Sequence, residues 1–550
     1  MSVARQVLDV AAQWGATTVF GLPGVHNLAF WRTDGTVASH RRTTPLVVRH
    51  EQAAVYAADG WARRTGRLGA AVVTTGPGAA NTVAAFGEAA AARSPVLLVA
   101  SEIPQSLRRE GRLRGVLHES RDQAALFAPL AKAVFTPRTP GEVARALRMA
   151  VATALAAPCG PVYLDVPADV LGQPADAGGL EERPAAPSGN GSTAPPSDRN
   201  TTPRSDGNLE AAAALLGRAR VVIWTGTGAV DHADDVAALA TRLGAPVVNS
   251  YGGRGTPPTD HPCAVGLPPH EPEVAELIGS ADVLLAVGGD LDGMNTRNWT
   301  MPRPPLLVTL DTVAPADPPE WPADVAVTGH GALRALLDQV PERAPWARTG
   351  LRDTVFARLR VDPASAEAIA VLDAVEAART EDTVLVCDMA VAGYWVGGYA
   401  SARAPRRLAY PVGWGTLGFG LPAALGAAAA GHPVIAVCGD GGLAMALGEL
   451  ATLVQEQLPV TVLVVDDAGY GMLRYDQMRA GDPEVGVDLV TPDFVALAAA
   501  FGLAATGVPS VRDGLADALA KAVRSGAPHL VRVPARLTPP RTTSPRWHED

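Results

Sequence analysis

The segment PVIAVCGDGGLAMALGELATLVQEQLPVTVLVVDDAGYGMLRYDQ, residues 433–477, carries the strongest structural signal in the chain. An apolar strand runs from Pro433 into the turn Gly439-Asp440-Gly441-Gly442, and a helix is predicted from Leu443 to about Gln455. A second apolar strand then ends in Asp466-Asp467-Ala468-Gly469-Tyr470-Gly471. Strand, helix and strand in this order predict two neighbouring parallel strands that end at the carboxyl edge of one sheet, where α/β proteins bind ligands.

The residues at these two strand ends suit a diphosphate and a metal ion. Glycines allow the backbone to approach a phosphate closely, and the N-terminus of a helix favours anions. Asp440 and Asp467 place a carboxylate on each strand end. Mg²⁺ typically binds one or two carboxylates together with phosphate oxygens and water. A polar turn without a ligand is the simpler alternative, but the second acidic strand end at this spacing favours a metal and diphosphate site.

The same segment resembles the thiamine-diphosphate motif of the acetolactate synthase family, in which Gly-Asp-Gly is followed by a helix and a strand ending in Asn-Asn. The resemblance implies that the side chains of Asp440 and Asp467 and the carbonyl of Gly469 hold Mg²⁺. It also implies cofactor contacts from Gly439, Gly441, Gly442, Tyr470, Gly471 and Met472. Asp467 stands where the family usually has asparagine. The aspartate adds a negative charge beside the diphosphate, and metal affinity would then follow its protonation.

Three turns near the N-terminus follow the order and approximate spacing of the same family. They are Gly21-Leu22-Pro23-Gly24, Arg49-His50-Glu51 and Gly76-Pro77-Gly78-Ala79-Ala80-Asn81. Taken alone, Glu51 could be an acidic residue favoured in a first helical turn. The resemblance implies instead that Glu51 hydrogen-bonds the aminopyrimidine ring nitrogen of the cofactor, and that Pro23, Gly24 and Asn81 lie at the same site. A carboxyl group shielded from water can share a proton with that weakly basic nitrogen.

A further Gly-rich run, Gly415-Thr416-Leu417-Gly418-Phe419-Gly420-Leu421-Pro422, also matches the family. By resemblance, Leu417 is the bulky residue that holds the cofactor bent, and Gly415 contacts the cofactor beside it. Many relatives have methionine at this position, and leucine supplies a similar volume. In this family the activating glutamate and the metal site face each other across a subunit interface. The resemblance therefore implies a homodimer or a homotetramer.

The rest of the chain alternates short apolar strands with helices, among them Ala-rich helical stretches at roughly 51–64 and 79–92. Strands are predicted at 17–20, 45–50, 70–75, 95–101, 161–166, 221–225, 246–250, 281–288, 305–311, 383–388, 433–439, 459–467 and 529–534. This pattern predicts an α/β fold of three consecutive doubly wound parallel-sheet domains. By resemblance they are a pyrimidine-binding domain at 1–175, a central domain at 211–345 and a diphosphate-binding domain at 350–535. The Pro- and Ser-rich stretch 176–210 is predicted to be a disordered linker, and 536–550 a loose tail.

Composition and charge exclude several classes of partner. The net charge of -10, without a visible basic stripe, argues against nucleic acid. No uninterrupted apolar stretch reaches the roughly 20 residues that cross a bilayer, and the N-terminus is typical of an amphipathic helix rather than a signal peptide. The four cysteines fit neither a zinc site nor a disulfide framework. We therefore expect a cytoplasmic protein without a membrane or nucleic-acid partner.

The positions expected near the substrate depart from those of housekeeping acetolactate synthases. Asp476 stands about where those enzymes have tryptophan, Ala390-Val391-Ala392-Gly393 replaces a Gly-Gln-His-Gln run, and Arg254 lies near a lysine position. Other residues, namely His26, Leu117-His118-Glu119, Asp122-Gln123 and Arg474-Tyr475-Asp476, look like the branch that includes guanidino-2-oxo-acid decarboxylases. A 2-oxo acid is therefore the expected substrate, and acidic groups in the pocket would suit a cationic tail.

Six residues are candidates for contact with the reacting molecule. His26 and His118 are candidate proton donors or acceptors, because imidazole titrates near neutral pH. The candidate substrate contacts are Val25, Gln123, Tyr475 and Asp476. A solvated surface charge is the alternative for Asp476, and a hydrogen-bonded structural histidine is the alternative for His118.

The leading interpretation is a thiamine-diphosphate-dependent lyase or transferase that decarboxylates a 2-oxo acid and then protonates the product or ligates it to a second carbonyl compound. One alternative is a non-decarboxylating lyase or ligase for 2-hydroxy ketones, with His26 as the proton shuttle. Another is an inactive paralogue that binds the cofactor, which Asp467 alone favours. In the central domain, Gly226-Thr227-Gly228 and Gly288-Gly289-Asp290 lack the full dinucleotide fingerprint. Some acetolactate synthases bind FAD there, but we expect none here.

Overall fold

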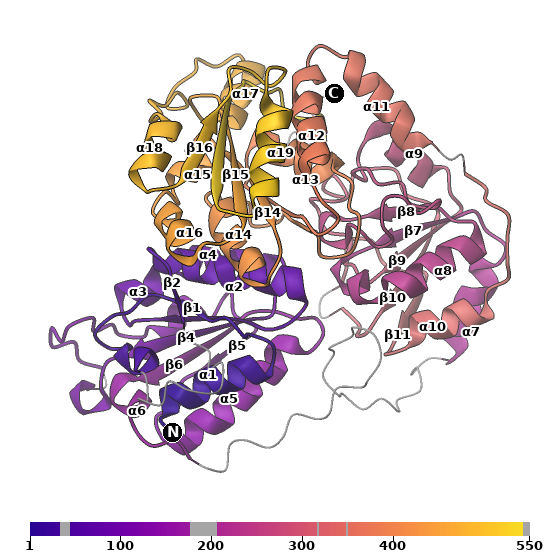
Figure 1. The fold of residues 1–550 in the computed structure, drawn as a ribbon. Helices are drawn as coiled ribbons and strands as arrows, with labels where there is room; N and C mark the ends of the chain where they lie inside the picture. Colours follow the sequence, from indigo (N-terminus) through magenta and orange to yellow (C-terminus); the bar gives the residue numbers. More distant parts are fainter. Residues whose placement is uncertain (33–44, 110, 177–205, 316–317, 348–349, 543–550) are drawn as a thin grey trace.

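The computed structural model describes residues 1–32, 45–109, 111–176, 206–315, 318–347 and 350–542. These residues form three parallel sheets of six, five and six strands, each covered by helices (Figure 1). The predicted α/β fold with three doubly wound domains is confirmed. Residues 177–205 of the predicted linker and 543–550 of the predicted tail lie outside the described residues. No helix among the described residues is long and apolar enough to cross a membrane.

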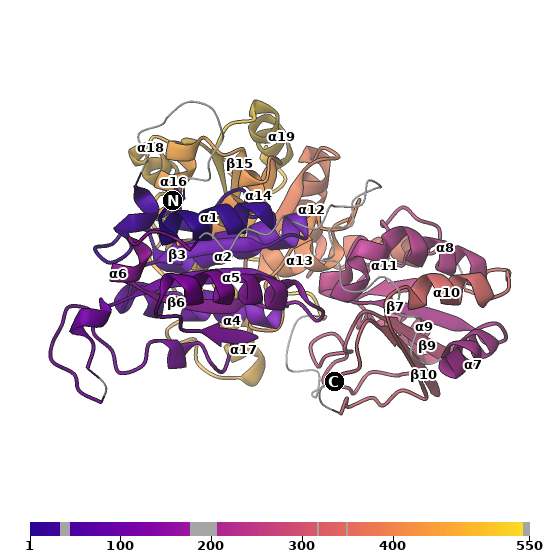
Figure 2. The same ribbon diagram turned by 90° about the horizontal axis from the view of Figure 1, so that it is seen from below.

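The N-terminal sheet has the strand order β2-β1-β3-β4-β6-β5. Its strands are β1 (Phe20–Gly21), β2 (Leu46–Val47), β3 (Gly69–Val73), β4 (Val96–Glu102), β5 (Ala133–Phe135) and β6 (Val162–Pro167). Alternate residues of β4 point to opposite faces. Leu97 packs with α1 (Val3–Gln13), α5 (Pro140–Leu155) and α6 (Ala168–Leu171). Leu98 packs with α2 (Glu51–Thr65) and α4 (Val83–Ala91) on the other face (Figure 2).

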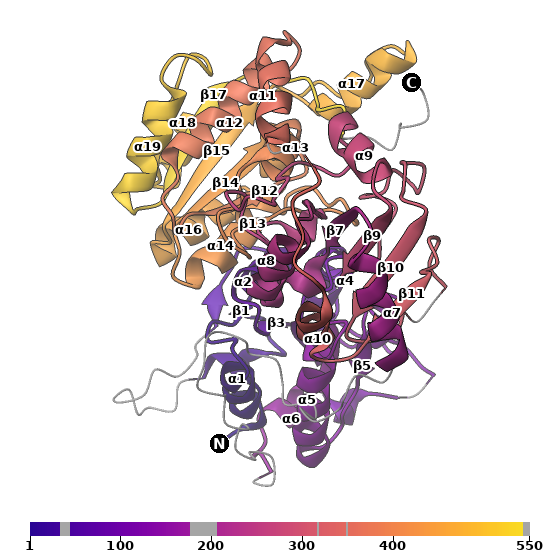
Figure 3. The ribbon, with the colours of Figure 1, turned by 90° about the vertical axis from the view of Figure 1, so that its right-hand side faces the viewer.

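The middle sheet has the order β11-β10-β9-β7-β8. Its strands are β7 (Val221–Thr225), β8 (Val247–Asn249), β9 (Val283–Val287), β10 (Leu306–Asp311) and β11 (Val325–Thr328). Helices α7 (Asp206–Leu216), α8 (Ala233–Leu243) and α10 (Ala332–Gln339) share one core cluster on one face. Helix α9 (Pro272–Gly279) belongs to the other face, which continues into the C-terminal domain (Figure 3).

The C-terminal sheet has the order β13-β12-β14-β15-β17-β16. Its strands are β12 (Val384–Cys387), β13 (Leu408–Ala409), β14 (Val434–Gly439), β15 (Val460–Asp466), β16 (Ala504–Gly507) and β17 (His529–Pro534). Its helices are α11 (Leu351–Val361), α12 (Ala366–Ala378), α13 (Val391–Tyr399), α14 (Gly420–Ala429), α15 (Asp440–Ala444), α16 (Glu449–Glu456), α17 (Gly471–Ala480), α18 (Phe494–Ala500) and α19 (Leu515–Ser525). β14 and β15 pair directly, as the sequence predicts, and Gly439 lies opposite Val465.

The C-terminal sheet shares one apolar core with each of the other two domains. The face that carries α14 continues into the α2 face of the N-terminal sheet. The opposite face, with α12, α13 and α19, continues into the middle domain. Helices α2 and α14 cross at glycines, because a Cβ on Gly60 would collide with the Ala423 carbonyl and one on Gly426 with the Ala57 carbonyl. The helix that begins with Glu51 is therefore seated directly on the C-terminal domain of the same chain.

Two helices differ from the sequence expectation. The stretch 79–92 forms α3 (Pro77–Ala80) and α4, which are separated at Asn81 and Thr82. The helix expected from Leu443 to Gln455 is likewise divided into α15 and α16. The break has a physical reason, because Glu449 at the start of α16 accepts hydrogen bonds from the backbone N–H groups of Arg49 and His50 at 2.9 and 3.1 Å. The second helix thus points its first turn at the N-terminal domain.

The first part of the predicted loose tail is held in place. Trp395 Nε1 donates to the carbonyl of Thr538 at 2.8 Å, and His270 Nε2 donates to the carbonyl of Thr542. The Thr542 hydroxyl also lies 3.2 Å from the Tyr399 hydroxyl. The prediction of a loose tail is therefore wrong for residues 536–542, because buried aromatic and imidazole groups of two domains bind its backbone.

Candidate functional site

A cavity of about 210 Å³ opens at the carboxyl edge of the C-terminal sheet. Its wall is drawn from segments 389–394, 415–417, 439–442, 465–473 and 535–537. The segments follow strands β12, β14, β15 and β17 and include the Gly-rich run before α14. The turns that follow β14 and β15, and the turn that carries Leu417, therefore meet around one space. Every residue that lines it belongs to the C-terminal domain.

Asp440 and Asp467 face each other at this edge. Both line the cavity, and burial followed by the neighbouring Asp440 carboxylate raises the pKa of Asp467. Burial also raises the pKa of Asp440, whose Oδ2 accepts a hydrogen bond from the N–H of Gly469 at 2.9 Å. Two mutually repelling carboxyl groups beside a cavity fit a divalent cation, which would relieve the repulsion.

The available donor set fits Mg²⁺ together with a diphosphate better than a metal held by protein alone. Among the described residues there is no group of three or more His, Cys, Asp and Glu side chains that could hold a metal ion. Two carboxylates and one carbonyl leave coordination positions that phosphate oxygens and water would complete.

The glycines at the cavity are required by close contacts. A Cβ on Gly441 would stand 2.8 Å from the Tyr470 ring, and one on Gly471 would collide with the Asp467 carboxylate. A Cβ on Gly442 would lie 3.0 Å from Oδ2 of Asp388. The backbone N–H groups at the start of α15 therefore face the cavity without side chains in front of them, which suits an anion.

Three family models match the chain, one for each sheet. Residues 1–126 match the N-terminal TPP binding domain of thiamine pyrophosphate enzymes, residues 209–330 their central domain, and residues 388–533 their C-terminal TPP binding domain. A protein described as a probable 2-ketoarginine decarboxylase from Pseudomonas aeruginosa is 33% identical over 92% of this chain and 89% of its own length. The chain belongs to the thiamine pyrophosphate enzyme family.

Other members of this thiamine pyrophosphate (thiamine diphosphate) enzyme family are more distant. A probable acetolactate synthase large subunit from Methanocaldococcus jannaschii is 28% identical over 98% of this chain and 93% of its own length. The solved structure of a thiamine diphosphate-dependent 4-hydroxybenzoylformate decarboxylase from Rhodococcus jostii covers 98% of this chain and 99% of its own. It superimposes with a TM-score of 0.79 at 24% identity, which supports the fold.

In this thiamine pyrophosphate enzyme, Glu51 is the first residue of α2 and Asn81 lies beside it. Asn81 Nδ2 donates a hydrogen bond of 3.0 Å to Oε2 of Glu51. A Cβ on Gly78 would lie 3.4 Å from the other carboxylate oxygen, and a Cβ on Gly24 would lie 2.6 Å from Thr74. The three N-terminal turns thus meet around Glu51, with Pro23 exposed on the Gly24 turn. None of these residues lines the cavity of the same chain.

His26 and His118 form a pair next to these turns. Their ring centroids are 5.4 Å apart in an edge-to-face arrangement. Burial, followed by the positive charge that His118 can carry, lowers the pKa of His26. His26 Nε2 and His118 Nδ1 are buried and have no hydrogen-bond partner among the described residues. His118 has a φ of +66°. A Cβ added to Gly76 would stand 2.8 Å from the Cβ of His118.

Gln123 is buried at the centre of a hydrogen-bond network in the N-terminal domain. It is 1% exposed, and its Oε1 accepts from the Thr75 hydroxyl at 2.8 Å and from the Gly76 N–H at 2.6 Å. Its Nε2 donates to the Ser101 carbonyl, the Tyr163 hydroxyl and Asp165. These partners occupy the hydrogen-bonding groups of the amide within the chain, and the expected substrate contact stays a prediction.

The remaining substrate candidates are dispersed. Val25 is 61% exposed beside His26. Tyr475 and Asp476 lie on α17, whose first residues Met472 and Leu473 line the cavity. Asp476 is half-buried. Burial, and then the charge of Asp476, raise the pKa of the cavity residue Tyr394 to about 12. Asp476 is thus a negative charge next to the cavity wall.

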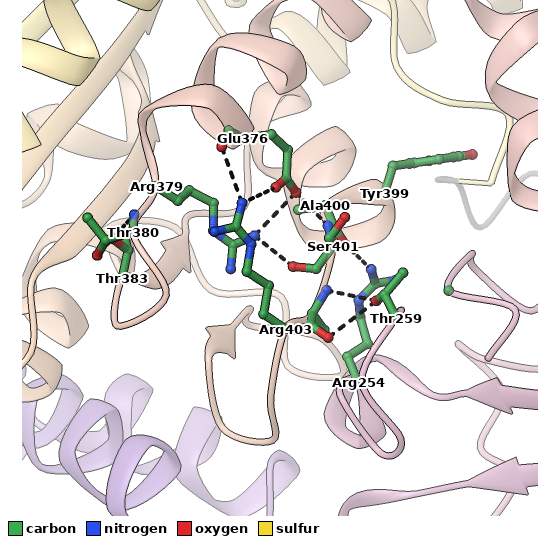
Figure 4. Close-up of polar contacts among 12 residues, drawn as sticks. Arg254, Thr259, Glu376, Arg379, Thr380, Thr383, Tyr399, Ala400, Ser401 and Arg403 are labelled. Carbon is green, nitrogen blue, oxygen red and sulfur yellow. Dashed lines mark hydrogen bonds and ion pairs between the residues drawn. The ribbon is translucent and has the colours of Figure 1, made fainter. Parts of the chain in front are cut away.

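Arg254 lies away from the cavity, in the joint between the middle and C-terminal domains (Figure 4). It is 6% exposed and donates to the carbonyls of Gly398 and Ala400 at the C-terminus of α13. Arg352 donates to the Tyr399 carbonyl at 2.8 Å, and Arg379 to the Ser401 carbonyl at 2.6 Å. The expected place near the pocket is therefore wrong for Arg254, because this arginine satisfies carbonyl groups that the helix leaves unpaired.

Asp388 supports the site, although no sequence motif points to it. It follows β12, is 1% exposed, and its Oδ1 accepts from the N–H groups of Met389 at 2.8 Å and Gly418 at 3.1 Å. Burial raises its pKa to about 6. Through Gly418 it holds the turn that presents Leu417 to the cavity. The available signal was an aspartate directly after an apolar strand, in the same position as Asp440 after β14.

Proposed function

We propose that this enzyme decarboxylates a 2-oxo acid with thiamine diphosphate bound through Mg²⁺ at the cavity of the C-terminal sheet. The observation that carries the proposal is the pair Asp440 and Asp467 on adjacent strand ends beside that cavity. These two carboxylates and the Gly469 carbonyl would hold the metal ion. The diphosphate would bind at the start of α15, against Gly439, Gly441 and Gly442. The opposite wall of the cofactor site would be Tyr470, Gly471 and Met472. A third wall would be Gly415 and Leu417.

When bound, thiamine diphosphate supplies the carbanion that attacks the substrate carbonyl carbon and receives the electrons of the broken bond. Glu51, held by Asn81, would keep a proton on the aminopyrimidine ring nitrogen. His26 and His118 would donate and accept protons at the reacting carbon and oxygen atoms, and the lowered pKa of His26 keeps it neutral and able to accept a proton near neutral pH.

A second copy of the chain is part of the proposal. The cavity is lined by residues of the C-terminal domain alone, whereas Glu51, Asn81 and the two histidines belong to the N-terminal domain. Large apolar side chains on or next to the segments that line the cavity are exposed: Trp414 before Gly415 at 49%, Met445 at the end of α15 at 56%, and the lining residue Leu473 at 52%. An apolar rim of this kind suits the N-terminal domain of a partner subunit. A homodimer would complete the site, and a homotetramer would pair two dimers.

The proposed substrate carries a cationic tail. Asp476 places a negative charge beside the cavity residue Tyr394, and the 33% identical relative is described as a probable 2-ketoarginine decarboxylase. A guanidinium group and a carboxylate form strong charge-assisted hydrogen bonds. The second candidate function, cleavage or ligation of 2-hydroxy ketones without decarboxylation, rests on the His26–His118 pair, which could move the hydroxyl proton of such a substrate.

Cofactor binding is tested first by thermal unfolding of metal-stripped protein. A ligand that binds the folded state raises the unfolding midpoint. We expect a rise that needs thiamine diphosphate and Mg²⁺ together. A midpoint that neither component alone nor the two together can raise would contradict the proposal and favour an inactive paralogue.

Substrate choice is tested with a matched pair. We expect faster CO₂ release from 5-guanidino-2-oxopentanoate than from its uncharged analogue 5-ureido-2-oxopentanoate, and a smaller difference in Asp476→Asn. Asp482→Asn, an exposed aspartate beyond α17, is the control. Equal rates for both substrates would remove the cationic tail from the proposal. Cleavage of 2-hydroxy ketones without CO₂ release from any 2-oxo acid would favour the second candidate.

The central domain and the cellular location remain predictions. The turns at Gly226 and Gly288 pack against each other, since a Cβ on Gly228 would lie 3.0 Å from the Gly288 backbone. We propose that this domain works without FAD, and a flavin absorbance in the purified protein would contradict this. The four free cysteines support the proposed cytoplasmic location.

A further inference from the structure

Arg474, on the first turns of α17, encloses the turn that carries two of the proposed metal ligands. Its Nη1 lies 3.2 Å from Oδ2 of Asp467, and its Nη2 donates to the carbonyl of Ala468 at 3.2 Å. Nε and Nη2 also lie 3.2 and 2.9 Å from Oδ1 of Asp488. One guanidinium group therefore joins residues 467 and 468 to the strand-like segment at 488. Arg474 is 9% exposed and the Asp467 side chain 12%, so this contact is shielded from water, whereas Asp488 is exposed.

The same guanidinium fixes the third residue of the turn. A Cβ on Gly469 would collide with Arg474 Nη2 and with the Val487 carbonyl. Ala468 has a φ of +54°, a left-handed conformation that an alanine adopts only under constraint. The Gly469 carbonyl, proposed to bind the metal, thus follows a backbone that Arg474 holds from behind. Arg474 is the larger of two positive charges that act on Asp467, and Arg536 adds a weaker one.

The contact also bears on charge. Family members usually carry a neutral asparagine where this chain has Asp467, so the aspartate adds a negative charge next to a diphosphate. An ion pair with Arg474 brings that position back to a net charge near zero, while the other carboxylate oxygen stays available to a metal. Asp466, the neighbouring carboxylate, is engaged by Arg532 at 2.6 Å and does not compete for Arg474.

We propose that Arg474 is a positioning residue that allows an aspartate to serve at position 467, by neutralising its charge toward the diphosphate and by holding the 467–469 turn. The proposal rests on the proposed function, because it concerns the same cofactor site. It differs from a merely structural role in one respect. The contribution of Arg474 to diphosphate affinity depends on whether residue 467 carries a charge.

The test is a double-mutant cycle read out by binding. The dissociation constants of thiamine diphosphate and of inorganic diphosphate are measured calorimetrically at saturating Mg²⁺ for the wild type, Arg474→Gln, Asp467→Asn and the double variant. We expect Arg474→Gln to weaken both ligands at least about tenfold, because an unpaired buried carboxylate then faces the diphosphate. In the Asp467→Asn background the same change should weaken them less than about threefold. Arg524→Gln, an exposed arginine in the last turn of α19, is the control.

The unfolding midpoint of the metal-stripped variants separates folding from binding. If Arg474→Gln fails to fold, Arg474→Lys replaces it, because lysine keeps the charge but cannot reach the three acceptors at once. Equal losses of affinity in the wild-type background and in the Asp467→Asn background would overturn the inference and leave the proposed function intact. A wild type that binds thiamine diphosphate no better with Mg²⁺ than without it would overturn both.

Discussion

The carboxylate of Glu51 is held by the side-chain amide of Asn81, whose Nδ2 lies 3.0 Å from Oε2. The two residues come from separate turns of the N-terminal domain, one at the start of α2 and the other between α3 and α4. This contact fixes the carboxylate direction before any cofactor arrives, and leaves Oε1 beside Gly78.

Replacing Glu51 by glutamine should abolish turnover and spare binding. Glutamine has nearly the same shape, but it cannot share a proton with a ring nitrogen. We expect kcat to fall by about 100-fold or more, with the dissociation constant of thiamine diphosphate changed only slightly. Steady-state CO₂ release and calorimetric binding measure the two quantities. Glu456→Gln, an exposed glutamate at the end of α16, should leave both unchanged. Undiminished turnover in Glu51→Gln would contradict the assignment of Glu51.

Mixing two inactive variants should restore activity if the site forms between subunits. In a mixed dimer of Glu51→Gln and Asp440→Ala chains, one site combines both defects and the other combines an intact Glu51 with an intact metal site. In the purified mixed dimers one of the two sites should be active, which is about half of the sites. Coexpression with two affinity tags, followed by tandem purification and a decarboxylation assay, measures this. Purified mixed dimers without activity would show that Glu51 and Asp440 act within one chain.

Loss of Arg254 should destabilise the joint between the middle and C-terminal domains. Arg254→Met leaves the buried carbonyls of Gly398 and Ala400 without their donor, at a cost of about 1–3 kcal/mol for each group. Calorimetry should record a midpoint lower by several degrees. Arg403→Met is the matched control at the same joint, because Arg403 is more exposed and pairs with Glu376 at the surface, where ion pairs contribute about 0–1 kcal/mol. Equal effects of the two substitutions would contradict this prediction.

The C-terminal segment should loosen as the pH falls. His270 is 4% exposed, and burial lowers its pKa to about 4. The hydrogen bond to the Thr542 carbonyl raises the pKa, but by less than burial lowers it. In the unfolded chain the imidazole has a pKa of about 6.5. The unfolded or detached state therefore binds the proton first, and the stability present above pH about 6.5 is lost progressively toward pH 4.

Hydrogen-exchange protection of residues 535–542, corrected for the intrinsic rate at each pH, measures this loss. We expect protection to decrease between pH 7 and 4.5 in the wild type and to change less in His270→Gln. His232→Gln, an exposed histidine of the middle domain, should behave as the wild type does. Protection that is independent of pH in the wild type would remove His270 from this role.

The interior strands were predictable from sequence, and the strands missed lie at sheet edges. β5, β11, β13 and β16 are the four that were not predicted, and each is an outermost strand of its sheet. Interior strands of a parallel sheet are buried on both faces and are therefore continuous apolar runs. An edge strand such as β16, Ala504–Gly507, is exposed or half-buried along its length and carries no such run. Its neighbours in space decide its conformation.

Site residues divide in a similar way. The positions of Asp440 and Asp467 were predictable because each directly follows an apolar strand within a recognisable motif. Glu51 was placed at the start of a helix by its motif, and the roles of all three residues stay predictions. The hydrogen-bond partners of Gln123 and Arg254 were not predictable, because they lie far away in sequence. Gln123 bonds groups 22 to 48 residues away, and Arg254 bonds carbonyls more than 140 residues away. No local pattern contains such distances.

The crossing of α2 and α14 at Gly60 and Gly426 has a consequence for paired chains. Those backbones touch, so the helix that begins with Glu51 cannot slide on the domain that carries Asp440 and Asp467 in the same chain. In a symmetric pair, that one rigid body would supply the glutamate to one centre and the metal ligands to the other. A displacement at either centre would then be transmitted through this helix crossing to the other centre. The two centres of a pair would therefore open and close together.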